Sequence, residues 1–209
     1  QMTTTGQFLG LKTSQNVVGD LVGSEKPEEV IVVGGHLDSW DQGTGAIDDG
    51  AGIAITMAAA KVMIDHNLKP KRTIRVVFWG SEEVSQPAGD TTETGGGDFR
   101  EAHKSELANY VAHAESDFGA DKINNFALSP TDDAAFVTKL GNLLYPLGIY
   151  NDTKATPNGG EDSGAMNGFV PAFDLNQDGY RSFDIHHTPN DTLDRVDPQQ
   201  LNHNVAAWT

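Results

Sequence analysis

A histidine and three aspartates lie close together in the sequence and could bind a divalent metal ion. His36 and Asp38 follow the apolar run at residues 30–33, and Asp48 and Asp49 come before an alanine-rich stretch. The apolar run predicts a buried strand and the alanine-rich stretch a helix, so one loop carries these side chains. Imidazole and carboxylate groups at the carboxyl end of a strand are typical of a metal site on an open α/β sheet.

Side chains of the same kinds follow three other predicted strands. Glu82 and Glu83 come after one strand, Asp117 after another, and His187 after the last. A single acid at a strand end is most often a turn or cap residue, but four coincident cases at one edge of a sheet favour a metal site. The sequence has no cysteine, so a metal site here uses histidine and carboxylate ligands.

Hydrophobic patterning predicts the elements that bring these residues together. Apolar runs between turn residues predict strands, and apolar residues at helical spacing predict helices. We expect strands at 16–23, 29–34, 73–80, 108–115 and 169–175, and helices at 50–66, 99–107, 134–144 and from the cap residue 197 onward. This alternation predicts an α/β fold, a three-layer α/β/α sandwich with a mixed, mostly parallel central sheet.

Composition narrows the classes of partner. The formal net charge of -16 over 209 residues argues against nucleic acid and against anionic membrane surfaces as partners. No apolar stretch approaches the roughly 18 residues that a membrane span needs. We see no internal repeat and no linker, and expect residues 1–209 to be one catalytic domain, a fragment of a longer precursor.

Over nearly its whole length the chain resembles the co-catalytic zinc peptidases, a family that includes bacterial secreted aminopeptidases and carboxypeptidase Q. The resemblance rests on GGHLDSW…AIDDGAG, WGSEE, ESD and HHTPNDT, and HLDSWD, GTGAIDDGAG and KPKRT place it nearer the carboxypeptidase Q-like branch. It implies two Zn²⁺ ions per chain. It also implies Glu82 as general base, Asp48 as bridging ligand, and four terminal ligands: His36, Glu83, Asp117 and His187.

Other polar residues near these motifs have supporting roles in this interpretation. Asp38 is expected in the catalytic site, where its carboxylate accepts the second N–H of the His36 imidazole and fixes the tautomer. Asp49 is expected to begin the helix, and Asp191 to support the His187 loop. His186 either lines the substrate pocket or faces solvent.

Several further features carry weaker expectations. Asp162 falls where the family often has an aspartate near the site. We expect the remaining histidines to be surface or helix residues: His66, His103, His113 and His203. Residues 86–98 are rich in glycine and threonine and predict a long loop, which either shapes the specificity pocket or is a solvated insertion.

The function expected from this resemblance is hydrolysis of the peptide bond after an unblocked N-terminal residue of short peptides or dipeptides, by a di-zinc metalloexopeptidase. One alternative is a glutaminyl cyclase-like acyl transferase with a single zinc, and another is a non-enzymatic receptor-type domain of the same fold. The resemblance also implies a peptide substrate and a secreted, periplasmic or extracellular location. The oligomeric state is left open.

Overall fold

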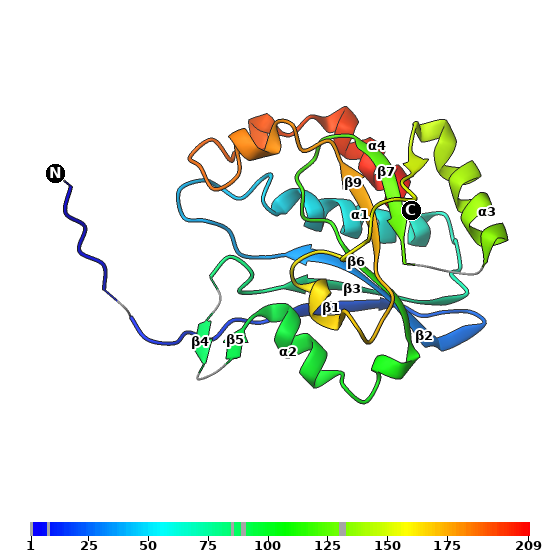
Figure 1. Cartoon of the computed structure of the whole chain (residues 1–209), viewed down its shortest axis with the longest axis horizontal. Helices are drawn as coiled ribbons and strands as arrows, with labels where there is room; N and C mark the ends of the chain where they lie inside the picture. The colour runs from blue at the N-terminus through cyan, green and yellow to red at the C-terminus, as the bar shows by residue number, and fades with distance from the viewer. Residues whose placement is uncertain (1, 8, 85, 89–90, 130–132) are drawn as a thin grey trace.

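The computed structural model describes residues 2–7, 9–84, 86–88, 91–129 and 133–209, and Figure 1 shows the arrangement of its elements. In chain order they are β1 (Val17–Leu21), β2 (Lys26–His36), α1 (Gly50–Asp65), β3 (Arg72–Trp79), β4 (Gln86–Ala88), β5 (Thr91–Glu93), α2 (Gly95–Ala102), η1 (Leu107–Asn109), β6 (Tyr110–Glu115), β7 (Ile123–Leu128), α3 (Ala134–Leu144), η2 (Tyr145–Leu147), β8 (Tyr150–Asn151), η3 (Ser163–Met166), β9 (Phe173–Gln177), η4 (Ser182–Asp184), η5 (Leu193–Arg195) and α4 (Pro198–Trp208). None of the described helices is long and apolar enough to cross a membrane.

The central sheet brings three carboxyl strand ends to one edge. Its described strands have the order β1-β3-β2-β6. β2 lies between β3 and β6 and runs parallel to both, whereas β1 pairs antiparallel with β3. Because neighbouring parallel strands end on the same side, the residues that follow β2, β3 and β6 meet there.

A second sheet of described strands continues the first. Its order is β8-β7-β9, with β8 parallel and β9 antiparallel to β7. A parallel bridge between His113 of β6 and Ala172, just before β9, connects the two sheets. The predicted mixed sheet is therefore confirmed, although it divides into two hydrogen-bonded parts.

Helices cover both faces of the sheet, which confirms the three-layer arrangement (Figure 1). On one face, Val32, Val77 and Trp79 of the strands pack with Phe99 of α2 and Met166 of η3. On the other face, α1 packs against α4. β2 is thus covered on both sides, as its uninterrupted apolar run predicts.

Two strands of the second sheet escaped the sequence prediction. β7 contains Asn124 and Asn125 between its apolar residues, and β8 is only two residues long, so neither shows a periodic pattern. The last strand also begins later than predicted, at Phe173, because Pro171 precedes it and Phe169 is 66% exposed.

The region at 86–98 is more ordered than a long loop. β4 and β5 pair antiparallel, and α2 begins at Gly95 with the Thr94 side chain accepting from the Gly97 amide. A glycine triplet hides this helix start from propensity rules, since glycine is a poor helix former. Residues 89 and 90 of this predicted loop lie outside the described residues.

Candidate metal centre

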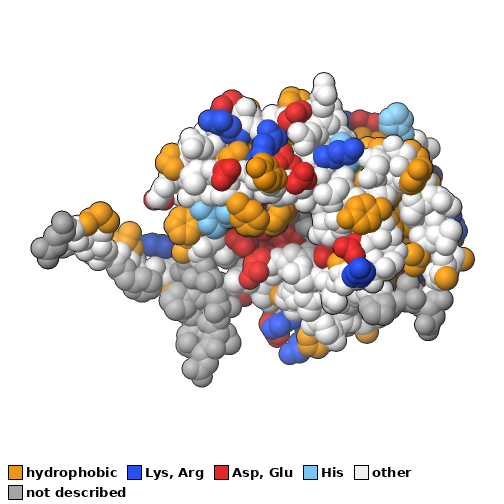
Figure 2. Space-filling view, turned by 45° about the horizontal axis from the view of Figure 1, so that its top comes forward, with side chains coloured by type: hydrophobic (Ala, Val, Ile, Leu, Met, Phe, Trp, Pro, Cys, Tyr) orange, Lys and Arg blue, Asp and Glu red, His pale blue; other side chains and the backbone are white. Residues whose placement is uncertain are grey.

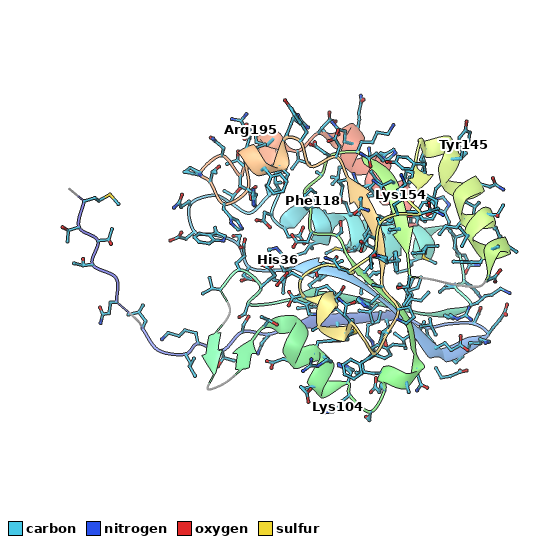
Figure 3. All side chains as sticks on the ribbon, viewed as in Figure 1. His36, Lys104, Phe118, Tyr145, Lys154 and Arg195 are labelled. Carbon is cyan, nitrogen blue, oxygen red and sulfur yellow. The ribbon has the colours of Figure 1, made fainter. Side chains whose placement is uncertain are left out.

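Acidic and histidine side chains meet at the carboxyl edge of the central sheet. His36 is the last residue of β2, Glu82 and Glu83 follow β3, and Asp117 follows β6. Asp48 joins them from the residue before the cap of α1. Figure 3 labels His36 where β2 ends, and Figure 2 shows red carboxylates gathered in a hollow beside histidine and hydrophobic side chains.

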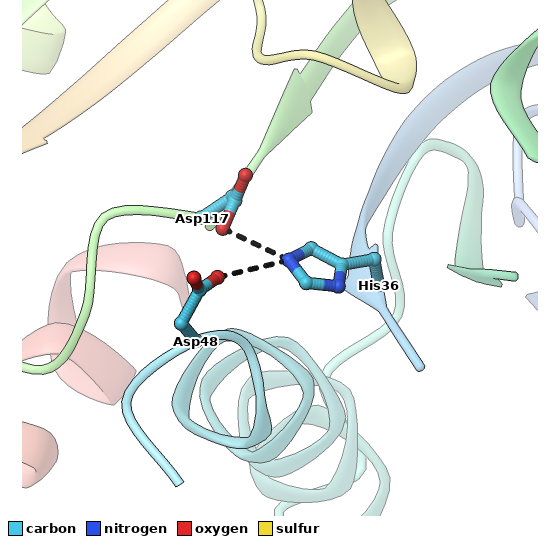
Figure 4. A group of neighbouring side chains, drawn as sticks. All are labelled: His36, Asp48 and Asp117. Carbon is cyan, nitrogen blue, oxygen red and sulfur yellow. Dashed lines mark hydrogen bonds and ion pairs between the residues drawn. The ribbon is translucent and has the colours of Figure 1, made fainter. Parts of the chain in front are cut away.

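One half of the site is built around His36, whose side chain is fully buried. Its Nε2 lies 3.1 Å from Oδ1 of Asp48 and 3.2 Å from Oδ1 of Asp117 (Figure 4). Burial alone would lower the pKa of His36, but its hydrogen bonds to Asp117 and Asp48 raise it above the ordinary value.

The other half is built around His187, which shares the same aspartate. Its Nε2 lies 3.0 Å from Oδ2 of Asp48 and 2.9 Å from Oε2 of Glu83. The two oxygens of Asp48 therefore face different histidines. A carboxylate in this position can bridge two metal ions.

Within the described residues, three sets of side chains place one ligand atom each within 4.8 Å of the others. They are His36 with Asp48 and Asp117, His36 with Glu82 and Glu83, and Asp48 with Glu83 and His187. The sets contain every residue for which the sequence predicts a metal ligand. They also contain the expected general base, at the edge of the same centre.

The electrostatics of the site suit a bound cation. Burial raises the pKa of Glu82 to about 8, and the carboxylates of Asp117 and Glu83 add to this effect. Burial also raises the pKa of Glu83 to about 7, with a further contribution from Asp48. The Oε1 atom of Glu83 is buried without a hydrogen-bond partner among the described residues. Buried, uncompensated carboxylates are stabilised by a metal ion, so the donor set fits one.

The end of β2 is fixed by the start of α1. Asp49 is the N-cap of α1 and accepts from the Gly52 amide, and its second oxygen accepts from the His36 amide at 3.0 Å. A side chain at Gly35 would collide with this carboxylate. Asp49 therefore begins the helix, as predicted, and also holds the backbone of His36.

Asp38 differs from its predicted contact. The His36 Nδ1 atom lies 2.9 Å from the main-chain oxygen of Asp38, whereas it is 3.8 Å from the Asp38 carboxylate. The carboxylate instead accepts from the amides of Glu82 at 3.0 Å and Glu83 at 3.1 Å. Two consecutive amides chelate it more favourably than one imidazole, because they are aligned by the turn after β3.

His187 comes from a loop rather than directly from a strand end. It lies ten residues after the end of β9, beyond η4, and has a left-handed φ of 58°. The Asp191 carboxylate accepts from the amides of Ile47 at 2.6 Å and Asp48 at 3.1 Å, and so ties the two loops together. The predicted supporting role of Asp191 is confirmed.

Two further residues were predicted near the site, His186 and Asp162. His186 is half-buried, contacts the rings of Phe183 and His187, and belongs to none of the candidate metal sets, so its place in a substrate pocket stays a prediction. Asp162 is 2% exposed and accepts from the Gly96 amide at 2.5 Å. Burial raises its pKa to about 6.

The sequence prediction placed His113 wrongly and overlooked the contact of Trp40. His113 is a fully buried residue of β6 rather than a surface or helix residue, and its Nδ1 lies 3.0 Å from Oγ of Ser163. Trp40 has its ring centroid 4.9 Å from that of His187. The sequence signal for Trp40 was its position two residues after Asp38 in the metal motif. Spacing alone cannot predict which residue an aromatic ring in a loop contacts.

Comparison with known proteins agrees with this fold. The family model for peptidase family M28 matches residues 16–209, and the chain therefore belongs to that family. Rat carboxypeptidase Q (Rattus norvegicus) is 36% identical over 96% of this chain. The crystal structure of a peptidase M28 precursor from Shewanella amazonensis is 43% identical, covers 92% of this chain and has a TM-score of 0.81.

A more distant structure shares the fold. It is a zinc aminopeptidase from Bacillus subtilis, 18% identical over 93% of this chain and 49% of its own length, with a TM-score of 0.67. The present chain spans 42% of the length of rat carboxypeptidase Q and 42% of the Shewanella chain. The chain is thus similar to part of each of these proteins.

Proposed function

We propose that this chain is a catalytic domain of a di-zinc metalloexopeptidase, which hydrolyses the peptide bond after an unblocked N-terminal residue of short peptides or dipeptides. The observation that carries the proposal is the division of the Asp48 carboxylate between two ligand sets. Oδ1 faces His36 and Oδ2 faces His187, each within 3.1 Å. Membership of the peptidase family supplies the class of reaction.

The donor set determines which ions and ligands we assign. His36 and Asp117 would hold one zinc ion, Glu83 and His187 would hold the other, and Asp48 would be shared. Two imidazoles and three carboxylates suit zinc, and the Bacillus subtilis relative is described as a zinc aminopeptidase. Two zinc ions bound here would polarise the scissile carbonyl and lower the pKa of an attacking water.

Glu82 is assigned as the general base. It takes a proton from the attacking water and gives it to the leaving amine. Without metal, burial raises the pKa of Glu82 to about 8. Two bound cations would lower this pKa again, so that the carboxylate could accept a proton at neutral pH. Asp38 positions Glu82 through the backbone, because its carboxylate accepts hydrogen bonds from the main-chain amides of Glu82 and Glu83.

The acidic hollow supports a substrate with a free amino terminus. A protonated amine gains favourable electrostatic energy among carboxylates that are only partly neutralised by metal. A net charge of -16 disfavours polyanionic partners at the same surface. We extend the proposal to a secreted or periplasmic location, which fractionation of the native host would test.

The decisive test compares Glu82→Gln with wild type and with Glu161→Gln, an exposed control. We expect Glu82→Gln to keep its zinc content and to lose about 10²–10⁴-fold in turnover, the range typical of a general base. Elemental analysis gives the zinc content, and a panel of aminoacyl amides, dipeptides and N-blocked peptides gives the activity. Near-normal turnover by Glu82→Gln, or cleavage of blocked peptides, contradicts the proposal.

The two alternatives have distinct outcomes in the same experiment. One zinc ion per chain together with cyclisation of N-terminal glutaminyl peptides would favour the acyl transferase. Zinc binding without any turnover on the peptide panel would favour a non-enzymatic domain.

A further inference from the structure

The side chain of Asn16 joins two backbone segments that flank the turn carrying Glu82. Its Oδ1 accepts a hydrogen bond from the Gly80 amide at 3.0 Å, and its Nδ2 donates to the Gly95 carbonyl at 2.8 Å. Gly80 directly follows β3, and Gly95 is the first residue of α2. A carboxamide has both a donor and an acceptor and can satisfy these two groups at once.

Gly80 and Gly95 lie at the two ends of the connection between β3 and α2. Glu82 and Glu83 follow shortly after Gly80, and the paired strands β4 and β5 come before Gly95. Asn16 connects Gly80 with Gly95. A contact of this kind restricts the conformations of the described residues next to it, since it replaces a flexible closure with two hydrogen bonds.

The packing around Asn16 leaves room for backbone only. A side chain at Gly80 would collide with Ser14, and one at Gly95 would collide with the carbonyl of Gly80. Three segments, at residues 14–16, 80–81 and 94–95, therefore approach one another closely. The dark-blue chain that leads into β1 passes near the start of α2 in Figure 1, in agreement with these contacts.

The turn held by Asn16 contains an unfavourable backbone conformation. Ser81 has a left-handed φ of 64°, which costs about 1–2 kcal/mol for a residue with a side chain. Such a conformation persists only where its surroundings determine it. Here the Gly80 amide is held by Asn16 on one side of Ser81, and the Glu82 and Glu83 amides are held by Asp38 on the other.

We propose that Asn16 is a positioning residue for the general base and that it sets the turnover number without contacting the metal ligands. This inference rests on the proposed peptidase function for its kinetic part. When Asn16 is lost, the Gly80 amide loses its acceptor and Ser81 can relax, so the Glu82 carboxylate moves from its position beside His36 and Glu83. A displacement of about 1 Å can lower a rate by up to roughly 10²-fold.

The test uses three variants of the full chain loaded with zinc. Asn16→Ala removes both hydrogen bonds, whereas Asn16→Asp keeps an acceptor for the Gly80 amide and loses the donor to Gly95. Gln15→Ala is the matched control, because Gln15 is an exposed neighbour. The readouts are kcat and KM on an aminoacyl amide, zinc content, and hydrogen exchange in the peptide that covers residues 80–84.

We expect Asn16→Ala to lower kcat about tenfold, with KM and zinc content within twofold of wild type. Its 80–84 peptide should exchange faster, because its backbone is no longer held. Asn16→Asp should recover only part of kcat and of the protection, since it retains the contact nearest Glu82 but turns a carboxylate oxygen toward the Gly95 carbonyl. Gln15→Ala should match wild type in all four readouts.

The inference is overturned when Asn16→Ala matches Gln15→Ala in kcat and in exchange, or when its lower activity is fully explained by lost zinc. If wild type hydrolyses no substrate of the panel, the proposed function fails, and the exchange of the 80–84 peptide alone then decides the role of Asn16. If Asn16→Ala does not fold, Asn16→Ser takes its place, and the same comparison applies.

Discussion

Asp191 holds Asp48 through the backbone: its Oδ2 accepts from the Asp48 amide at 3.1 Å, while its Oδ1 accepts from the neighbouring Ile47 amide at 2.6 Å. Asp191 is 4% exposed and follows His187 by four residues. One buried carboxylate therefore fixes Asp48, the proposed shared ligand, relative to the loop of His187, a proposed terminal ligand. The proposed metal centre would depend on this contact even though Asp191 is outside each of the candidate metal sets.

Replacement of Asp191 by Asn should weaken metal binding and lower stability. The Asn side chain can accept from only one of the two main-chain amides, of Ile47 and Asp48, because its NH₂ group is a donor and faces the other. A buried main-chain N–H left without an acceptor costs about 1–3 kcal/mol. Loss of such an outer contact typically lowers metal affinity by about 10–100-fold. Zinc titration by calorimetry and urea unfolding measure the two effects. Asp194→Asn, an exposed change in the same loop, is the control and should change neither.

Single substitutions of the ligands should separate the two halves of the centre. We expect His36→Ala or His187→Ala to retain about one zinc per chain, since the proposed assignment gives each histidine to one ion. Asp48→Ala should lose affinity at both positions, because its two oxygens serve both. Elemental analysis after dialysis gives the stoichiometry. Two tightly held ions in Asp48→Ala would rule out the bridging assignment.

Removal of zinc should lower the thermal stability of the chain. Binding to the native state alone stabilises it by about 4 kcal/mol when free metal is 1,000 times the dissociation constant. For a domain of this size that corresponds to a decrease of roughly 8–16 °C in Tm after chelation. Differential scanning calorimetry with and without chelator measures it, and Mg²⁺ in place of Zn²⁺ should restore little of the loss. An unchanged Tm contradicts a metal site with several ligands.

Acid should destabilise the protein partly through His113. Burial lowers the pKa of His113 to about 4, below its unfolded value of about 6.5. Its contribution is fully present above about pH 6.5 and is lost as pH falls toward 4, because the unfolded state then binds a proton that the native state does not. The difference between the two pKa values corresponds to a loss of about 3 kcal/mol in the free energy of unfolding as the pH falls from 6.5 to 4.

The His113 contribution is measured as a difference between pH profiles. We expect the free energy of unfolding of His113→Gln to fall less steeply than that of wild type between pH 6.5 and 4. His66→Gln, at the exposed end of α1, is the control and should follow wild type. Parallel profiles for His113→Gln and wild type would show that the pKa of this histidine is the same in the native and unfolded states.

The sequence predicted the elements whose patterns are periodic. α1, α3 and α4 lie where helical spacing and the Asp197 cap place them, and β2 and β3 differ from prediction by a few residues at their ends. β7 could not be predicted in this way, because Asn124 and Asn125 interrupt its apolar residues. The helix start at Gly95 depends on tertiary packing against Gly80, which no local propensity describes.

The candidate site was easier to predict than its supports. His36, Glu83 and Asp117 lie next to strand ends, and parallel strands bring their ends together whatever the details of the loops. The partner of a buried histidine depends on distances that differ by less than 1 Å, here 2.9 Å to the main-chain oxygen of Asp38 and 3.8 Å to its carboxylate. Spacing therefore could not distinguish the Asp38 carboxylate from its main-chain oxygen, and it gave no reason to single out Asn16.

If Asp48 is shared as proposed, its carboxylate would also make the two halves of the centre thermodynamically interdependent. A first ion that orders this side chain leaves less conformational entropy to be lost by a second, whereas the charge of the first ion opposes the second. By reciprocity, an ion bound beside His187 would change the affinity for an ion beside His36 by the same factor as the reverse. The cooperativity between two such ions would therefore depend on the side-chain order of Asp48 as well as on the repulsion between their charges.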